Sequence, residues 1–315
     1  MKYSKILQTG IYLPLNIVTN TDLEKMIETS DDWIVSRTGI KQRHMVSVNE
    51  NSTTMAVEAA KSILDLHDPS SIDMLIVATC TPNKLMPSTA CSVQNELGLD
   101  NAFCFDLNAA CSGFVYAITC ADQYIKSGMC KKVLVIGSDA MTKIVDWEDR
   151  STCVLFGDGA GAVLLGASDT PGIVASYLGS DGESDKVLST TGSIVQAPAP
   201  SYIEMKGKEV FKRAVKSLDM VVGEVLAKAG LTAKDIDWLV PHQANKRIIT
   251  ATASSLDMPL DKVIITVDKH ANTSAASIPL ALHSGISAGK IKRGDMILLE
   301  SFGAGFTWGA SLIQY

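Results

Sequence analysis

The chain contains a weak internal repeat, which limits its possible folds more than any other feature of its 315 residues. The segment SIDMLIVATC at 71–80 resembles DIDWLVPHQA at 235–244, so the numbering of the two segments differs by an offset of 164. The segment KVLVIGSDA at 132–140 resembles DMILLESFGA at 295–304, at an offset near 163. Self-similarity at a fixed offset is typical of a repeated structural unit. We therefore expect two halves with similar folds.

Each half alternates buried strands with amphipathic helices. Short runs rich in Val, Ile and Leu, without polar alternation, predict strands that are buried on both faces. At 112–127 and 210–230 the apolar residues follow a 3.6-residue period, which predicts helices with one buried face. Both halves close with a Gly-rich turn leading into an apolar segment, at 157–166 and 303–313. This pattern predicts an α/β fold made of two similar βαβ-type halves.

The boundary between the halves is expected near 166–172, where GASDTPG supplies turn residues. The predicted units are an N-terminal half, 1–168, and a C-terminal half, 169–315. The halves differ by two insertions, a polar loop at 141–155 and a second loop at 181–207. Loops on a repeated scaffold are where substrate contacts tend to lie.

Composition and charge narrow the class of protein. The formal net charge is −6, which disfavours broad binding to nucleic-acid phosphates and requires a local basic patch for any anionic partner. The seven cysteines form no C-x-x-C pair, so we expect reduced thiols, no disulfide framework and no metal site. Gln8, Gly10 and Pro14 break the N-terminal apolar run, which predicts no signal peptide. No uncharged stretch would span a bilayer, so we expect a cytoplasmic protein that does not insert into a membrane.

Cys111 is the candidate nucleophile. It lies in DLNAACSGF at 106–114, between a strand-like segment and an amphipathic helix. A cysteine at a helix N-terminus feels the positive end of the helix dipole, which favours the thiolate and predicts a lowered thiol pKa. Small neighbours such as Ala110 and Gly113 allow a sharp turn and leave room for a bound acyl group. The other cysteines are interpreted as buried structural thiols: Cys80, Cys91, Cys104, Cys120, Cys130 and Cys153.

His242 and Asn272 are the candidate partners of Cys111. His242 lies in VPHQANKR directly after a strand, and Asn272 lies in HANTSAAS at the expected start of a helix. Through the repeat, both fall near strand and helix ends equivalent to those around Cys111, so the three residues can converge on one crevice. A neutral imidazole and a primary amide both donate hydrogen bonds to an enolate oxygen. The remaining histidines are interpreted as structural: His44, His67, His270 and His283.

The Gly-rich run FGDGAGA at 156–162 does not predict a dinucleotide site. Its spacing is G-x-G-x-G, and an apolar strand follows where a phosphate-binding helix would begin. A tight turn between strands accounts for this run better.

Together these motifs resemble the β-ketoacyl-acyl carrier protein synthase III family of condensing enzymes, within the thiolase-like superfamily. The resemblance covers essentially the whole chain and rests on AACSGF, PHQAN, HANTSAAS and ESFGAGFTWG (300–309). It implies a duplicated thiolase-like fold with a layered αβαβα sandwich, a homodimer, and a catalytic triad of Cys111, His242 and Asn272. Chain-elongating relatives carry a second His where Asn272 stands, so the resemblance favours the initiating branch.

The resemblance also implies a reaction and its substrates. Cys111 would take an acyl group, expected to be acetyl, from acetyl-CoA or another short acyl-CoA, with an oxyanion hole from the backbone N–H groups of Cys111 and Ala304. His242 and Asn272 would then promote decarboxylation of malonyl-acyl carrier protein, and the resulting carbanion would attack the acyl-cysteine. The product, 3-oxoacyl-acyl carrier protein, would initiate type II fatty acid synthesis. No cofactor is expected beyond the coenzyme A thioester that serves as substrate.

Further substrate-binding residues follow from the same resemblance. Trp33, Arg37 and Arg150 would bind coenzyme A, because an indole and a guanidinium stack on adenine and Arg pairs with phosphate. Phe302 would flank the nucleophile at the acyl pocket. Met86 stands where some relatives have a Phe that lines this pocket, which leaves the length and branching of the primer open.

Docking of the acidic acyl carrier protein requires a local basic surface on this acidic chain. The segment MKGKEVFKRAVK at 205–216 and the pair Lys246–Arg247 supply basic residues. Lys212 and Arg247 match the docking positions of the family. Basic residues on an amphipathic helix can equally form a solvated face, so the sequence leaves both interpretations open.

Three other functions stay open on the sequence alone. The same triad could serve a specialised quinolone or polyketide pathway, with coenzyme A thioesters on both sides. A thiolase would need a second active-site cysteine near the C-terminus, whereas the last cysteine here is Cys153. A non-enzymatic redox sensor would use Cys111 as a reactive thiol and would tolerate the loss of His242.

Overall fold

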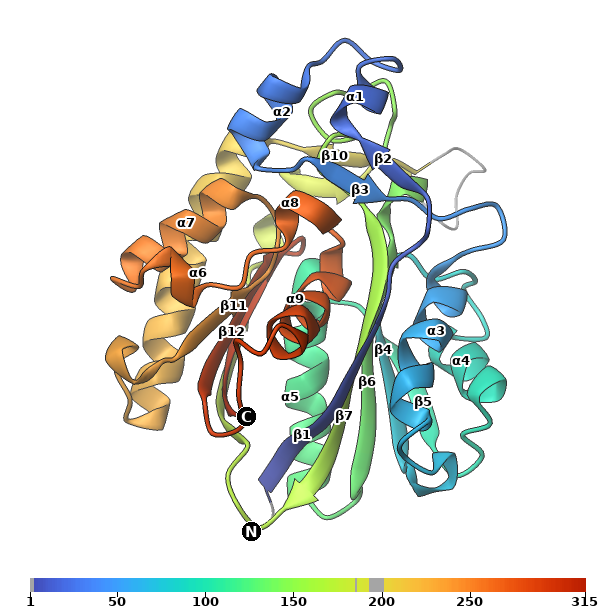
Figure 1. The fold of residues 1–315 in the computed structure, drawn as a ribbon, viewed down its shortest axis with the longest axis vertical. Helices are drawn as coiled ribbons and strands as arrows, with labels where there is room; N and C mark the ends of the chain where they lie inside the picture. Colours follow the sequence, from blue (N-terminus) through green and yellow to red (C-terminus); the bar gives the residue numbers. More distant parts are fainter. Residues whose placement is uncertain (1–2, 185, 193–200) are drawn as a thin grey trace.

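Two similar sheets form the framework of the molecule (Figure 1). The computed structural model describes residues 3–184, 186–192 and 201–315. The strand order in the N-terminal sheet is β1 (Tyr3–Tyr12), β7 (Asp158–Ser168), β6 (Lys132–Ala140), β4 (Met74–Ala78), β5 (Phe103–Leu107). The order in the C-terminal sheet is β8 (Ile173–Ser180), β13 (Thr307–Gln314), β12 (Met296–Gly303), β11 (Trp238–Pro241). In both sheets the first two pairings are antiparallel and the next is parallel, so the two sheets share one topology.

The repeat seen in the sequence corresponds to equivalent elements of the two halves. Strand β4 begins at Met74 and β11 at Trp238, while β6 begins at Lys132 and β12 at Met296, so both pairs keep the offset of the first repeated segment. The same offset relates helix α9 (Ser277–Ser287) to helix α5 (Gly113–Lys126). A parallel bridge between Leu239 and Val263 extends the C-terminal sheet at the place that β5 occupies in the N-terminal sheet. The prediction of two similar halves is confirmed.

Helices and sheets alternate in layers (Figure 1). Helices α5 and α9 lie between the two sheets, where Ile76 and Phe114 belong to the same buried cluster as Leu282 and Ile297. Helices α3 (Ser52–Leu64) and α4 (Thr89–Leu97) cover the outer face of the N-terminal sheet. Helices α6 (Gly207–Ala229) and α7 (Lys246–Ser255) cover the outer face of the C-terminal sheet. This arrangement confirms the predicted αβαβα sandwich.

The helices form where the sequence provides both an apolar face and a suitable end. Helix α6 buries Leu218, Val222 and Val225, which lie at the 3.6-residue period and confirm the helix predicted at 210–230. Helix α3 begins with a capping box, in which the side chain of Asn51 accepts from the backbone N–H of Thr54 and the Thr54 side chain accepts in return. Helix α6 is capped by Gly230, whose φ of 67° lies in the left-handed region that favours glycine.

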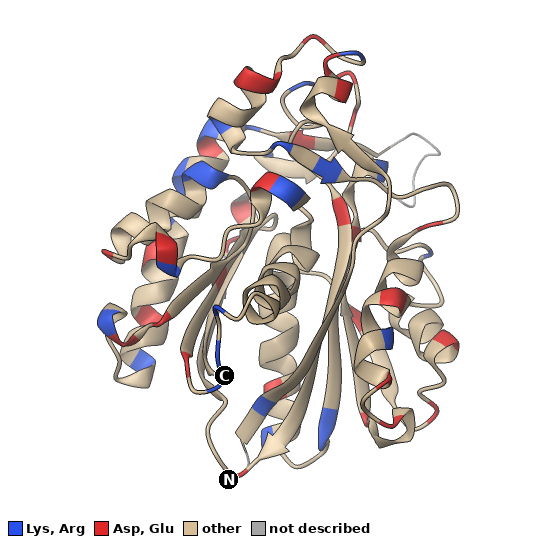
Figure 2. Cartoon of the chain, viewed as in Figure 1, with Lys and Arg blue, Asp and Glu red and all other residues tan. Residues whose placement is uncertain are grey.

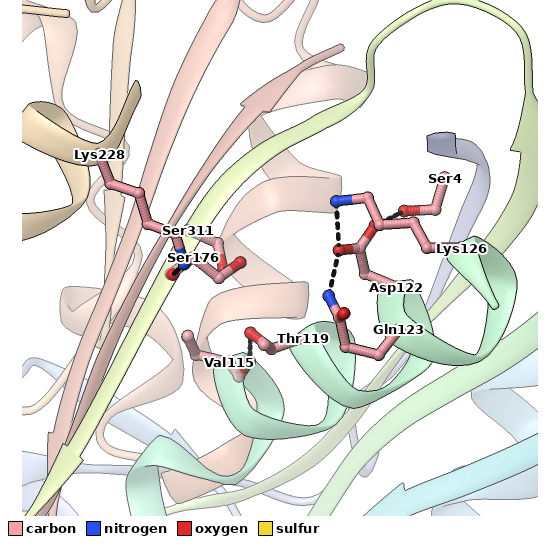
Figure 3. Close-up of polar contacts among 9 residues, drawn as sticks. All are labelled: Ser4, Val115, Thr119, Asp122, Gln123, Lys126, Ser176, Lys228 and Ser311. Atoms are coloured by element: carbon pink, nitrogen blue, oxygen red, sulfur yellow. Dashed lines mark hydrogen bonds and ion pairs between the residues drawn. The ribbon is translucent and has the colours of Figure 1, made fainter. Parts of the chain in front are cut away.

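Helix α5 is fixed to the sheets by polar contacts as well as by apolar packing (Figure 3). The buried carboxylate of Asp122 accepts a hydrogen bond from Ser4 in β1 at 2.5 Å and pairs with Lys126 one turn later at 2.7 Å. Nearby, the hydroxyls of Ser176 in β8 and Ser311 in β13 lie 2.8 Å apart. Because a buried polar group must be paired, the contact of Asp122 with Ser4 ties α5 to β1, while the two serines pair with each other within the C-terminal sheet.

Charged residues gather on the outer helices and on the small elements at one end, whereas the sheets are almost free of them (Figure 2). This distribution agrees with strands that are buried on both faces. Among the described residues, none of the helices is long and apolar enough to cross a membrane.

A group of small elements covers one end of the two sheets (Figure 1). Arg43, which is fully buried, ties this cap together by donating to Asn20 Oδ1 and to the carbonyl of Val154, both at 2.9 Å. The remaining strands and helices are β2 (Ile17–Thr19), β3 (Gln42–His44), β9 (Leu188–Thr190), β10 (Ile203–Met205), α1 (Asn20–Leu23), α2 (Asp31–Thr38) and α8 (Val267–His270). The 3₁₀ turns are η1 (Pro69–Ser71), η2 (Ala110–Ser112), η3 (Met141–Lys143), η4 (Gly182–Ser184), η5 (Ala233–Asp235), η6 (Leu260–Lys262) and η7 (Ser274–Ala276).

The predicted insertions contribute to this cap. The insertion at 141–155 contains η3 and Val154, whose carbonyl accepts a hydrogen bond from Arg43. In the insertion at 181–207, β9 and β10 pair with each other, and residues 185 and 193–200 lie outside the described residues. The link between the halves, 169–172, joins β7 to β8, while the central helices share one core. The division into units 1–168 and 169–315 stays a prediction.

Candidate functional site

A cavity of about 970 Å³ lies between the strand ends and the cap. Both halves of the chain contribute to its wall. The predicted site residues on this wall are Trp33, Arg37, Cys111, His242, Arg247, Asn272, Phe302 and Ala304. The structure therefore gathers side chains from almost the whole length of the sequence, from Trp33 to Ala304, around one space.

Cys111 lies in η2, immediately before α5. The preceding residue, Ala110, has a φ of 46°, and Ser274, at the equivalent place in the other half, has a φ of 51°. Left-handed backbone is costly for residues with a side chain and is concentrated at functional sites. Here it shapes the turn that leads into the central helix of each half, and both Cys111 and Ser274 lie on the wall of the same cavity.

The last residue of β12 and the loop after it pack tightly against the backbone around Cys111. A Cβ atom placed on Gly303 would lie 2.7 Å from the backbone nitrogen of Cys111, so glycine is required for this approach. Thr307 Oγ1 donates to the carbonyl of Ala109 at 2.8 Å, and Ser112 Oγ donates to the carbonyl of Thr307 at 2.9 Å. The positive φ in this loop is at Gly305, at 131°, and not at Ala304. Alanine at 304 therefore carries no left-handed strain.

The predicted lowering of the Cys111 pKa is wrong for this structure. The thiol is partly accessible through the cavity, but it lies deep in the protein. Its pKa is raised to about 12, mainly by burial and also by the nearby carboxyl of Asp139, although a hydrogen bond with Ser274 lowers it. Desolvation disfavours the thiolate, and Cys111 lies two residues before the first residue of α5, Gly113.

Asp139 and Ser274 form a network beside Cys111 that the motifs alone did not predict. Asp139, fully buried at the end of β6, accepts from the backbone N–H of Cys80 at 2.8 Å and of Ala275 at 3.1 Å. Ser274 Oγ lies 3.6 Å from the thiol of Cys80. Asp139 thus joins the ends of β4 and β6 to η7. An acidic residue at the end of a strand in KVLVIGSDA was the available signal.

His242 follows β11 and faces the cavity as a neutral imidazole. Its backbone N–H donates to the carbonyl of Glu300 at 2.8 Å, and its Nδ1 lies 2.6 Å from the hydroxyl of Ser277, the first residue of α9. Burial lowers the pKa of His242 to about 4. With Nδ1 engaged by Ser277, the ring nitrogen left for chemistry in the cavity is Nε2.

Asn272 is oriented by its own turn. Its backbone N–H donates to the carbonyl of Leu155 at 2.9 Å, and its carbonyl accepts from Gly157 at 3.1 Å. Its side-chain Oδ1 accepts from the backbone N–H of Ser274 at 2.9 Å. Because the amide oxygen is held by the turn, the amide nitrogen is directed away from it and is the group available as a donor to the cavity.

Trp33 and two arginines lie together at the cap. The guanidinium of Arg37, one turn after Trp33 in α2, lies 5.0 Å from the indole, and that of Arg150 lies 4.9 Å from it. Arg150 Nη1 also donates to the carbonyl of Glu28 at 2.9 Å. A cationic and aromatic cluster at the edge of a cavity suits a planar base with phosphates. The structure brings these three residues together as the sequence predicted.

The two residues predicted at the acyl pocket, Phe302 and Met86, lie in different places relative to the cavity. Phe302 stacks on Phe306 with ring centroids 4.8 Å apart and forms part of the cavity wall. Met86 lies on the segment between β4 and α4, is 83% exposed, and does not contribute to this wall. The assignment of Met86 to an acyl pocket therefore stays a prediction. Met141, next to the thiol of Cys80 at 3.7 Å, is a methionine on this wall.

The predicted docking residues lie on α6 and α7. Arg247 is at the cavity wall, with its guanidinium 5.2 Å from the ring of Phe211 in α6. Lys208 also reaches the wall, whereas Lys212 is on the outer surface of α6. Positions of Lys and Arg lie on the ends of α6 and α7 that adjoin the cap (Figure 2). In the described part of the chain, no three His, Cys, Asp or Glu side chains gather as they would around a metal ion.

The sequence is similar to known proteins over its whole length. Residues 105–182 match the family model of 3-oxoacyl-acyl-carrier-protein synthase III, and residues 226–315 match the model of its C-terminal part. The β-ketoacyl-acyl carrier protein synthase III of Alkalilimnicola ehrlichii is 53% identical over 323 residues, which cover 100% of both chains.

Solved structures share the fold closely. The crystal structure of 3-oxoacyl-acyl-carrier-protein synthase III from Aquifex aeolicus is 50% identical, with a TM-score of 0.94 over 99% of this chain and 100% of that chain. The priming β-ketosynthase of a polyketide biosynthetic pathway is 37% identical, with a TM-score of 0.95 over 99% of this chain and 96% of that chain.

Proposed function

The chain belongs to the 3-oxoacyl-acyl-carrier-protein synthase III family and is a condensing acyltransferase, and from this premise we propose the reaction and the roles of its residues. It condenses an acyl-CoA primer, principally acetyl-CoA, with malonyl-acyl carrier protein and releases CO₂. The product is 3-oxoacyl-acyl carrier protein, which initiates fatty acid synthesis. The observation that carries the proposal is the meeting of Cys111, His242 and Asn272 on one cavity wall.

In the first half-reaction Cys111 takes the acyl group. The sulfur forms a bond to the thioester carbon of acetyl-CoA, and the bond from that carbon to the sulfur of coenzyme A breaks. Because burial raises the pKa of Cys111 to about 12, the thiol must lose its proton as it attacks. Neutral His242 accepts this proton at Nε2 and passes it to the departing coenzyme A thiolate. The backbone N–H groups of Cys111 and Ala304 stabilise the tetrahedral intermediate.

In the second half-reaction the acetyl-cysteine is attacked by a carbanion. His242 Nε2–H and the amide of Asn272 donate hydrogen bonds to the thioester oxygen of the malonyl group, which favours its enolate after CO₂ leaves. The carbanion forms a bond to the acetyl carbon, and the bond between that carbon and the Cys111 sulfur breaks. A low pKa, about 4, keeps His242 neutral, so that it does not trap the carbanion by proton transfer.

The two half-reactions need Nε2 of His242 in opposite states, first as an acceptor and then as a donor. The hydroxyl of Ser277 suits this requirement, because a hydroxyl can accept from Nδ1–H or donate to Nδ1. Its 2.6 Å contact with Nδ1 therefore supports either tautomer. We assign Ser277 as a positioning residue for His242.

The other substrate contacts follow the geometry of the cap. Trp33, Arg37 and Arg150 bind the nucleotide part of coenzyme A, Phe302 flanks the acyl group, and Arg247 with Lys212 docks the carrier protein. The homodimer and the absence of a cofactor, expected from the family, and the cytoplasmic location, expected from the sequence, stay predictions.

Two variants separate the proposed roles. Cys111→Ser should form no acetyl-thioester with acetyl-CoA, as measured by mass spectrometry of the intact protein. Asn272→Ala should acetylate at Cys111 but fail to release CO₂ from malonyl-acyl carrier protein, because it lacks one donor to the enolate. Asn95→Ala, on the exposed face of α4, is the matched control and should behave as the unaltered enzyme. An Asn272→Ala enzyme that loses acetylation alone would contradict this assignment.

A second function has one observation in its favour. The structural likeness to a priming β-ketosynthase of a polyketide pathway is as high as that to the fatty acid enzymes. The identity to that protein is lower, 37% against 50% for the Aquifex aeolicus enzyme. Kinetics with malonyl-acyl carrier protein against malonyl-CoA distinguish the two functions, and equal kcat/KM values for both would favour the specialised pathway.

A further inference from the structure

Glu300 is a buried carboxyl group that the mechanism above does not use. It lies near the end of β12, is 1% exposed, and forms part of the cavity wall. Among the described residues its Oε2 has no hydrogen-bond partner. A buried unpaired carboxylate would be strongly destabilising, whereas a carboxylic acid is tolerated. Burial accordingly raises the pKa of Glu300 to about 8, with a hydrogen bond from Thr252 acting the other way.

The proposed reaction consumes a proton in its second half, and this requirement is the reason to look for a donor. The first half is balanced, because the proton of Cys111 leaves with coenzyme A. In the second half the malonyl carboxylate departs as CO₂, the carbon–carbon bond forms, and Cys111 is released as a thiolate. This thiolate must gain a proton before the next turnover, since the thiol of this buried residue has a pKa of about 12.

Few groups on the described cavity wall can supply that proton. The titratable side chains there, apart from Cys111 itself, are Arg37, Cys80, Lys208, His242, Arg247 and Glu300. Arginine does not give up its proton in proteins. His242 has a pKa of about 4 and is therefore neutral near pH 7. Burial raises the pKa of Cys80 well above its ordinary value, and Lys208 is an exposed side chain at the mouth.

Glu300 is close enough to serve through the cavity. Its carbonyl accepts from His242, and Gly303, three residues further along β12, touches the backbone of Cys111. Three strand residues span about 10 Å, a distance that a chain of about three hydrogen-bonded waters in the cavity can bridge.

We propose that Glu300 is the proton reservoir of the condensation half-reaction, delivering its carboxyl proton through cavity water to the thiolate of Cys111. The transfer converts Glu300–COOH and Cys111–S⁻ into Glu300–COO⁻ and Cys111–SH. The carboxylate then takes a proton from solvent, which restores the resting state. This inference rests on the proposed function, because only a decarboxylating condensation creates the proton demand.

Few titratable or charged groups near Glu300 can affect how the condensation rate depends on pH. Those on elements packed against β12 are His242 after β11, Cys111 in η2 and Lys208 in α6, while Ala310 lies opposite on β13. Helix α7, whose Thr252 hydrogen-bonds Glu300, adds Arg247. Because the acid form is the donor, the condensation rate should fall as the pH rises through about 8.

The test measures the two half-reactions separately as a function of pH. Acetyl transfer from acetyl-CoA to Cys111 and condensation of the acetyl-enzyme with malonyl-acyl carrier protein are followed by quenched flow. Glu300→Gln should acetylate normally but condense roughly 100-fold more slowly near pH 7, with no fall in rate above pH 8. Glu300→Asp, which keeps a carboxyl group, should recover part of the rate and the fall at high pH. Glu224→Gln, on the exposed face of α6, is the matched control.

Each outcome has one meaning. A Glu300→Gln enzyme that condenses at the normal rate, with the fall at high pH intact, would overturn the inference. Equal losses in acetylation and condensation would also overturn it, because they indicate a disturbed structure. If the unaltered enzyme were not acetylated at Cys111 at all, the proposed function would fail instead.

Discussion

Gly303→Ala tests whether the loop after β12 positions the nucleophile. The added methyl carbon would lie 2.7 Å from the backbone nitrogen of Cys111 and 3.1 Å from that of Ser112. Unbonded heavy atoms of this kind settle at about 3.5 Å, so the Cys111 amide and the 303–305 loop must separate by roughly 0.5–1 Å. Neither partner is the flexible end of a side chain, because both are backbone.

The expected loss follows from the amides that this displacement moves. The N–H groups of Cys111 and Ala304 are the proposed oxyanion donors, and losing one such donor costs about 3–4 kcal/mol, or a factor of about 10²–10³ in rate. Misplacement by about 1 Å has a similar effect, about 10²-fold. We therefore expect acetyl transfer to Cys111 to slow about 100-fold or more.

The assay is quenched-flow acetylation with acetyl-CoA, read by intact-protein mass spectrometry, with thermal unfolding as a check on folding. Gly223→Ala is the matched control, since a Cβ there meets nothing within 4 Å and the residue is inside helix α6. It should leave acetylation unchanged and stabilise the fold by up to about 1 kcal/mol. A folded Gly303→Ala enzyme that acetylates within about threefold of the unaltered rate would refute the reasoning.

Other predictions follow from contacts at the same site. Ser277→Ala removes the partner of His242 Nδ1 and should lower kcat for condensation about 10-fold or more at unchanged KM. Ser277→Thr keeps a hydroxyl and should restore kcat. Equal kcat values for the unaltered enzyme and both variants would contradict the role of Ser277. Trp33→Ala should raise the KM for acetyl-CoA about 10-fold, which corresponds to about 1.4 kcal/mol of lost binding, with little change in the KM for malonyl-acyl carrier protein. A change in the KM for the carrier protein alone would contradict the assignment. Glu300 has a pKa of about 8 when folded and 4.5 ordinarily, so the folded chain keeps a proton that the unfolded chain releases, and its contribution to stability is lost as the pH rises from 4.5 to 8. The loss is at most about 5 kcal/mol, and denaturant unfolding should show a smaller fall over this range for Glu300→Gln; identical pH profiles would contradict the raised pKa.

The fold could be predicted from the sequence because two strands and a helix recur at a single offset. The pairs β4–β11, β6–β12 and α5–α9 each keep that offset between their first residues, as from Gly113 to Ser277 for the two helices. The same repeat placed Cys111 and Asn272 at corresponding turns, and the structure puts both on one wall. Local pattern was sufficient here because the strands are buried on both faces and the helices on one.

Other features could not be predicted because they depend on the packing of distant segments. The motif around Cys111 predicted a lowered thiol pKa, but the burial that raises it arises from the combined packing of η7 and the β12 loop around η2. The contact of Ser277 with His242 joins two different elements of the C-terminal half, and no spacing rule indicates it.

The central claim is that Cys111 carries the acyl group and passes it to a carrier-bound carbanion. Acetylated enzyme is prepared with labelled acetyl-CoA, digested and mapped by mass spectrometry, before and after addition of malonyl-acyl carrier protein. We expect one label on the peptide that contains Cys111, followed by its transfer to acetoacetyl-acyl carrier protein with loss of CO₂. A label on another residue such as Cys80, or a label on Cys111 that malonyl-acyl carrier protein does not remove, would contradict the account.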